Sequence, residues 1–342
     1  MKNAIIVAFL LLAQAVFAQV KPDFFPEDVS SEGIAVRCFC KPGVRNKSRS
    51  KGLDISYGRL GNGTFKDEEG KFTAPLSQYK TWQQLEVDLK VPVINKDNFK
   101  LLLGYKYRSE SFDVSRFGGD FTETFRGLDA SILKNNSLSA IVTKPLNETK
   151  YLAFRLRYTA SGNYSGLMDF GSDYAIYKWL ALFGVKRDEN FEWGIGMGGS
   201  SSFRRTTVLP LFLYNRNFND RWGIEAALPG YVFGRYNLSQ KSILLFGAEY
   251  NSDSYRMKVK QPSNGVLDYA LNHSEVLGML RLEQQIAPWI WGNVKAGYQF
   301  NFSSDFESKS VNTTSFKVEP SDGFFFQIGV FISPPDRFFQ GE

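Results

Sequence analysis

Long segments of this chain alternate apolar and polar residues with a period of two, and this pattern limits the fold more than any other feature. In residues 99–110, Leu101, Leu103, Tyr105 and Tyr107 share one face, and mostly charged residues fill the other. Successive side chains of a β-strand point to opposite faces, so the pattern predicts strands with one apolar and one polar face. The same alternation recurs at residues 85–91, 151–159, 293–301 and 324–332.

The length of these segments favours strands that cross a membrane. Many of them reach about 10 residues, which a tilted membrane strand needs, whereas strands of soluble proteins average about five or six. Candidate strands occupy residues 34–41, 52–60, 82–92, 98–112, 128–145, 150–160, 173–187, 190–203, 206–216, 221–235, 241–257, 273–286, 289–302 and 323–333. The fold class expected is all-β, an antiparallel up-and-down transmembrane β-barrel of about 12–14 strands.

The connections alternate in length, as they do in outer-membrane barrels with short periplasmic turns and long outer loops. The short connections are 95–98, 147–150, 187–190, 217–221 and 287–288, and the long ones are 61–81, 113–127, 161–172, 258–272 and 304–322. One further short connection, Asn237–Gln240, would lie at the outer end, where the alternation predicts a long loop. A break at Leu228-Pro229-Gly230 would restore the order, because Pro and Gly both weaken a strand interior.

Aromatic residues follow the short connections within a few positions. Clustering at one level of a barrel predicts a girdle at the membrane interface. The residues concerned are Phe99, Tyr151, Phe191, Trp193, Trp222, Trp289 and Trp291.

The first residues predict export. Lys2 precedes an apolar run at 4–13, and Val16-Phe17-Ala18 places small residues where signal peptidase cleaves. We therefore expect a cleaved signal peptide at 1–18, an N-terminal segment at 19–50 with the candidate first strand, a barrel at 51–333 and a tail at 334–342. The expected location is the outer membrane of a Gram-negative bacterium, where the partners are its lipids and its barrel-assembly machinery.

Charge and cysteine content exclude several classes of protein. The net charge of +6 is spread over acidic and basic residues throughout, which argues against nucleic acid as a partner. The basic cluster of Arg45, Lys47, Arg49 and Lys51 is interpreted as a solvated loop. Residues 38 and 40 are the only cysteines; a disulfide between them would be strained, and their redox state stays open.

Little in the sequence points to catalysis. His273 is the only histidine, and its neighbour Ser274 would point to the opposite face of a strand, so the two cannot share a proton. The glycines of residues 194–199 lack the Lys-Ser/Thr of a phosphate loop and are interpreted as relief of crowding in a barrel wall. No cofactor or metal site is expected, and the protein is not expected to be an enzyme.

The segment Leu228-Pro229-Gly230-Tyr231, followed by Arg235-Tyr236-Asn237-Leu238-Ser239 and a final aromatic strand, resembles outer-membrane barrel proteins of Bacteroidota. Many of those families are known only as domains of unknown function, so the resemblance implies fold and location and little chemistry. One departure is that the last strand stops near Ser333, with a further tail after it, instead of ending the chain on an aromatic residue.

The polar face of the strands is the remaining functional lead. Lys or Arg on the lipid side of a barrel costs about 2–4 kcal/mol, so these charges must face the lumen. The candidates are Glu86, Asp88, Lys90, Lys106, Arg108, Arg155, Arg157, Glu249, Arg281, Glu283 and Lys295. They favour a channel or transporter for a small solute. The alternatives are a non-conducting, surface-binding barrel with a plugged lumen and, at the level of the fold, a secreted soluble β-sandwich.

Overall fold

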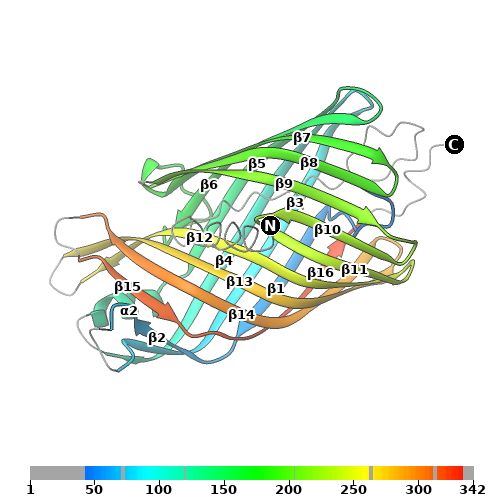
Figure 1. Ribbon diagram of the computed structural model, residues 1–342. Coiled ribbons are helices and arrows are strands. Elements are labelled where there is room, and N and C mark those ends of the chain that lie inside the picture. The colour runs from blue at the N-terminus through cyan, green and yellow to red at the C-terminus, as the bar shows by residue number, and fades with distance from the viewer. Residues whose placement is uncertain are drawn as a thin grey trace, which may run out of the picture.

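A single antiparallel sheet curls round until its two edges meet (Figure 1). The computed structural model describes residues 43–70, 74–118, 121–203, 205–261, 265–310 and 314–333. β1 (Leu53–Leu60) closes the sheet, because it pairs with β16 (Gly323–Ile332) on one side and with β3 (Ser77–Lys96) on the other. The predicted barrel is therefore confirmed, and the β-sandwich alternative is wrong.

Two strand positions in the barrel are each occupied by two segments. β1 is continued by β2 (Gly63–Asp67), and β16 is preceded by β15 (Phe316–Pro320), which pairs with both β2 and β14. The described barrel therefore has 14 strands, at the upper end of the predicted range. The other strands are β4 (Phe99–Phe117), β5 (Leu133–Pro145), β6 (Lys150–Gly162), β7 (Ala175–Asp188), β8 (Phe191–Ser202), β9 (Arg205–Asn217), β10 (Trp222–Leu228), β11 (Tyr231–Ser239), β12 (Ser242–Lys260), β13 (Val266–Ala287) and β14 (Ile290–Ser308).

The Pro-Gly break resolves the order of the turns. β10 ends at Leu228 and β11 begins at Tyr231, and Gly230 donates a backbone hydrogen bond to Ala227 in the turn between them. With this hairpin in place, all the short Asn- and Asp-rich turns, including the one after Ser239, lie at the same end of the barrel. We call this the periplasmic end. The candidate strand at 34–41 lies outside the described residues.

The predicted outer loops are shorter than expected, because strands continue into them. Residues 61–81 contain β2, 304–322 contain β15, and most of 258–272 belongs to β12 and β13. The expected alternation fails there because the outward positions become polar: Arg256 on β12 and Asp268 on β13, which are diagonal neighbours, form an ion pair. The loop after β4 carries a helix, α2 (Thr122–Asp129), and a 3-10 turn, η4 (Ser172–Tyr174), precedes β7.

Large apolar side chains cover the outer surface of the barrel. On β16, Phe324, Phe326, Ile328, Val330 and Ile332 are all exposed, and comparable residues recur on the neighbouring strands. An apolar band around a closed sheet is the surface of a membrane-spanning barrel of the outer-membrane type, so outer-membrane lipids surround it. None of the helices in the described residues is long and apolar enough to cross a membrane.

The predicted aromatic girdle is only partly present. Trp222 and Trp289 are well exposed on the outside, but Tyr151 and Trp291 are buried inside the barrel. Tyr151 donates a hydrogen bond to Glu192, and Trp291 stacks on Phe331. Position near a turn therefore did not decide the face: the strand register turns both rings inward.

An aromatic cluster fills the outer part of the barrel. Phe125 of α2 is fully buried and packs against Phe65, Phe306 and Phe316, with ring centroids 5.3–6.2 Å apart. Thr124 of the same helix donates a hydrogen bond to the Tyr269 hydroxyl. We refer to these four phenylalanines and Tyr269 as the outer aromatic cluster, which together with α2 closes that end of the barrel.

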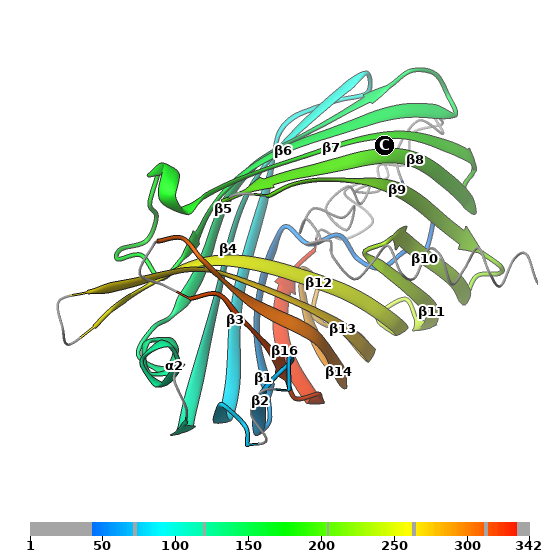
Figure 2. The ribbon, with the colours of Figure 1, turned by 60° about the vertical axis from the view of Figure 1, so that its left-hand side comes forward.

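Above its contact with β11, β12 leans across the barrel toward β6 (Figure 2). The last register pair with β11 is Tyr231 to Glu249, and further out β12 meets β6 at Arg256 and Gly162. Gly162 has φ +150°, and a Cβ there would lie 2.1 Å from the Arg256 carbonyl oxygen, so only glycine permits the approach. The outer end is thus narrowed by this contact as well as by the aromatic cluster.

Candidate functional site

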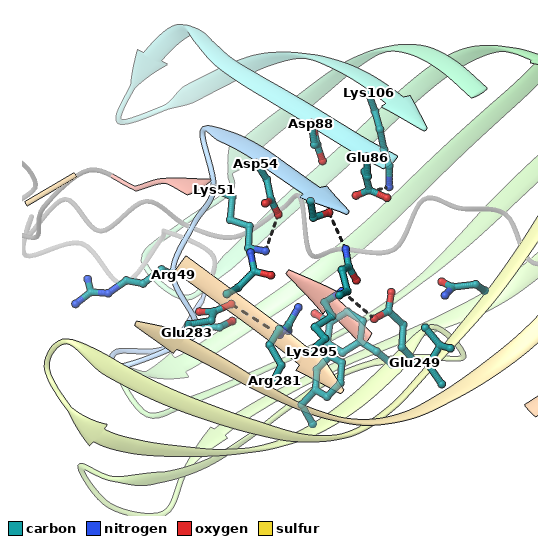
Figure 3. Close-up of a pocket in the computed structure, with 18 of the residues that line it drawn as sticks. Arg49, Lys51, Asp54, Glu86, Asp88, Lys106, Glu249, Arg281, Glu283 and Lys295 are labelled. Atoms are coloured by element: carbon teal, nitrogen blue, oxygen red, sulfur yellow. Dashed lines mark hydrogen bonds and ion pairs between the residues drawn. The ribbon is translucent and has the colours of Figure 1, made fainter. Parts of the chain in front are cut away.

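The strand alternation that exposes apolar residues to lipid turns charged residues into the lumen. They surround a cavity of about 140 Å³ in the periplasmic part of the barrel (Figure 3). Its wall comes from β1, β3, β4, β6 and β10–β14, with Gln327 of β16. The charged side chains that line it are Lys47, Arg49, Lys51, Asp54, Glu86, Asp88, Lys90, Lys106, Arg108, Arg157, Glu225, Glu249, Arg281, Glu283 and Lys295.

Ten of the eleven lumen candidates from the sequence line this cavity. The exception is Arg155, which is 2% exposed but is not part of the cavity lining. It lies on the same face of β6 as Arg157, because the two are separated by one residue. The fold thus brings these residues from distant segments of the chain to one cavity.

Opposite charges pair along the wall in two ways. Lys90 lies 3.2 Å from Asp88 on its own strand, because residues two apart share a face. Lys106 of β4 lies 3.2 Å from Glu86 of β3, across the strand pair. Two further pairs are looser: Arg281 to Glu283 at 3.8 Å and Lys295 to Glu249 at 3.9 Å.

The segment 43–51, which we call the strap, runs along the inside of the periplasmic rim. The backbone amide of Gly43 donates to Glu192 on β8, and the backbone amide and hydroxyl of Ser48 both donate to Glu225 on β10. The strap then joins the barrel wall, where the amide of Gly52 donates to the carbonyl of Ile332. The strap therefore follows the wall from β8 round to β1.

The basic cluster is only partly the solvated loop that was predicted: Arg45 is exposed and lies 3.1 Å from Asp220, whereas the other three side chains line the cavity. Arg49 lies over the Trp291 ring, 5.0 Å from its centroid, and donates to the carbonyl of Gln240. Lys51 pairs with Asp54 at 2.7 Å. Burial alone would lower the pKa of Lys51, but the Asp54 and Glu283 carboxylates outweigh it and raise this pKa above its usual value. The prediction failed for these side chains because it did not consider the carboxylates that interact with them, such as Asp54 and Glu283 beside Lys51.

The carboxylates that anchor the strap were missed in the sequence. Glu192 accepts hydrogen bonds from Gly43, Tyr151 and Asn215, and it is 1% exposed. Glu225 also pairs with the fully buried Arg235 at 2.9 Å. The available signal was a single acid within a short apolar segment, Gly-Ile-Glu-Ala-Ala-Leu at 223–228.

A second polar group separates the cavity from the apolar outer end. Arg108 contacts Glu110 and Asp253, each at 2.8 Å. His273 lies 3.1 Å from Glu275 and packs against Trp82. His273 is therefore buried within β13, which begins at Val266 and not at residue 273 as the sequence predicted.

The structure keeps the two candidate catalytic side chains apart. Ser274, next to His273 in the chain, bonds to the Ser252 hydroxyl, whereas His273 contacts Glu275. Within the part of the chain that the structure describes, no three His, Cys, Asp or Glu residues are grouped as metal ligands. Cys38 and Cys40 lie outside that part.

Solved structures with a likeness to this fold are bacterial outer-membrane proteins. A Pseudomonas aeruginosa FadL homologue is 11% identical, with 82% of this chain and 89% of that chain covered and a TM-score of 0.40. The COG4313 outer membrane channel from Pseudomonas putida F1 is 14% identical over 85% and 98%, with a TM-score of 0.41. The P. putida toluene transporter TodX is 8% identical over 83% and 90%, with a TM-score of 0.34.

No curated protein matches the chain in sequence. A family model described as a domain of unknown function, DUF6268, matches residues 53–333, which include every strand from β1 to β16. The chain therefore belongs to the DUF6268 family.

Proposed function

We propose that this protein is an outer-membrane channel for a small, charged solute. The observation that carries the proposal is the cavity inside the closed barrel, lined almost entirely by ionic and polar side chains. Paired opposite charges along a lumen let a solute exchange its hydration for protein contacts without a large desolvation cost. A wall that only filled space could have used apolar side chains at lower cost.

The outer aromatic cluster is the barrier that a solute must pass. It lies on the outer side of the cavity, and a space of about 10 Å³ lined by Phe65, Phe306, His273 and Glu110 lies beneath Leu128 of α2. Movement of α2 would open this end, because its 8 residues hold the cluster through Phe125 and Leu128. In the closed arrangement we therefore expect low and intermittent conductance.

Replacement of Phe125 by Ala tests the proposal in planar lipid bilayers. The variant removes the fully buried ring at the centre of the outer aromatic cluster, so we expect conductance above that of the wild type. The control is Phe300→Ala, which removes the same ring from the lipid-facing side of β14, where it is 46% exposed, and should leave conductance unchanged. A variant is folded if its unboiled sample migrates differently from its boiled sample on an SDS gel.

One alternative has an observation in its favour. The outer aromatic cluster could be a permanent plug, which would make the protein a non-conducting barrel that works through its outer surface. Absence of current from both the wild type and folded Phe125→Ala would favour this alternative over a channel. We infer a non-enzymatic role in either case, since Ser274 and His273 have separate partners.

Further proposals concern export and assembly. The signal peptide at 1–18, the segment 19–50, the barrel boundaries 51–333 and the tail 334–342 stay predictions, as does insertion by the outer-membrane assembly machinery. The same holds for origin in Bacteroidota. Mass determination of the mature protein would test cleavage after Ala18.

A further inference from the structure

The strap decides the net charge of the cavity. The lining holds nine lysine and arginine side chains against six carboxylates. Three of the nine, Lys47, Arg49 and Lys51, belong to the strap, and none of the six carboxylates does. The barrel wall alone therefore contributes six charges of each sign, and the whole positive excess comes from one short segment.

Most of the wall charges also lie beside a charge of opposite sign. Four pairs each join one basic and one acidic side chain of the wall, as Lys106 does with Glu86. Asp54 pairs instead with Lys51 of the strap, and Arg108 with Glu110 and Asp253, which do not line the cavity. Figure 3 shows Glu86 and Lys106 on one part of the wall and Arg281, Glu283, Lys295 and Glu249 on another, with Lys51 joined to Asp54. The strap cations thus add their charge to a wall that is otherwise neutral.

The strap lies where a field acts most strongly on a passing ion. It follows the periplasmic rim, anchored at Glu192 and Glu225, so solutes must pass it at that mouth. Low-dielectric walls focus the field of charges in a cleft and raise the local concentration of counter-ions. The screening length of about 8 Å at physiological salt is comparable to the reach of these side chains, so bulk salt does not cancel the effect.

We propose that the strap gives the lumen its ion selectivity, and that the solute admitted is a small anion. This inference rests on the proposed channel function. With the strap cations present the cavity favours anions, and with these side chains neutralised the cavity loses that preference.

The test is the reversal potential under a KCl gradient, in the Phe125→Ala background that opens the outer end. We expect chloride to be preferred over potassium by several-fold. The triple variant Lys47→Gln, Arg49→Gln, Lys51→Gln should move the reversal potential toward zero or to the potassium side. Lys47→Gln alone, a milder change should the triple variant not fold, should move it part of the way.

A matched control removes three lysines at the same end of the barrel but outside the cavity. Lys144, Lys150 and Lys241 are exposed, and none of them lines the cavity. Their joint replacement by Gln lowers the protein's charge equally and should leave the reversal potential unchanged.

The outcomes separate the two proposals. Potassium preference in the parent channel, or an unchanged reversal potential in the strap variants, would overturn the selectivity role while leaving the channel intact. An equal shift in the control would assign the effect to total charge and overturn it also. Absence of current from every folded variant would remove the channel function and, with it, this inference.

Discussion

Gly184 has no side chain because the ring of Tyr151 occupies the space. A Cβ built on Gly184 would lie 2.1 Å from the Tyr151 ring, which is fully buried. That ring cannot easily move away, since its hydroxyl donates to Glu192 at 2.7 Å and Glu192 in turn holds the strap and Asn215. One missing methyl group therefore supports a hydrogen-bonded centre that links three strands and the strap.

Gly184→Ala is accordingly expected to destabilise the barrel. Overpacking of this kind costs about 1–3 kcal/mol. Urea unfolding of the protein in lipid vesicles would measure the change in midpoint. The control is Gly61→Ala, because a Cβ at Gly61 meets nothing within 4 Å. Equal midpoints for both variants would show that Tyr151 is not held as tightly as its contacts indicate.

At the scale of elements, Glu225 is one of the carboxylates that hold the strap against the barrel wall. Glu225 accepts two hydrogen bonds from Ser48 and lies beside Lys47 in the cavity lining. The anchor is charge-assisted, and such bonds are roughly twice as strong as neutral ones. Loss of that charge should loosen the strap at Ser48, although the hydrogen bond from Gly43 to Glu192 remains.

Limited trypsin digestion of the folded protein would detect this loosening. In the wild type we expect slow cleavage at Arg45, Lys47 and Arg49, because the strap lies against the wall. Glu225→Gln should accelerate cleavage there severalfold. Glu123→Gln, which alters an exposed acid of α2 paired with Arg126, should not. Equal rates for all three proteins would contradict the anchoring role of Glu225.

The elements also show what a sequence of this kind can predict. Strands such as β4 and β6 were found because their outward side chains meet lipid and their inward ones meet water or charge, so alternation is complete. β2 and β15 were not predicted because both lie where the outward face of the barrel is polar. The role of the strap was missed for another reason: its Lys and Arg residues are locally indistinguishable from a solvated loop. Only the fold reveals that Glu192 and Glu225 accept hydrogen bonds from Gly43 and Ser48.

The site was predictable to the same degree. The alternation of side chains within one strand predicts that charges such as Arg281 and Lys295 face the lumen. Their partners do not, because Glu249 reaches Lys295 across the intervening strand β13. The alternation within strands also did not predict that aromatic side chains, including Phe125 from a predicted loop, would fill the outer half of the lumen.

For the whole molecule, closure of the sheet is the property with the largest physical consequence. A closed barrel leaves no strand edge, so every strand is held by hydrogen bonds on both sides and none can peel away alone. Here β1 completes the ring by pairing over its full length with β16 and with β3. Unfolding must therefore break the ring cooperatively, and SDS at room temperature should not achieve it.

We accordingly expect the mature protein to fractionate with outer membranes and to migrate differently on an SDS gel before and after boiling. The unboiled barrel binds less detergent and stays compact, whereas boiling exposes the whole chain. Removal of β16 by truncation after Pro320 is the control, since it deletes the strand that closes the ring, and its migration should not depend on boiling. A soluble full-length protein with no shift would contradict a membrane barrel, because its exposed apolar band has no stable place in water.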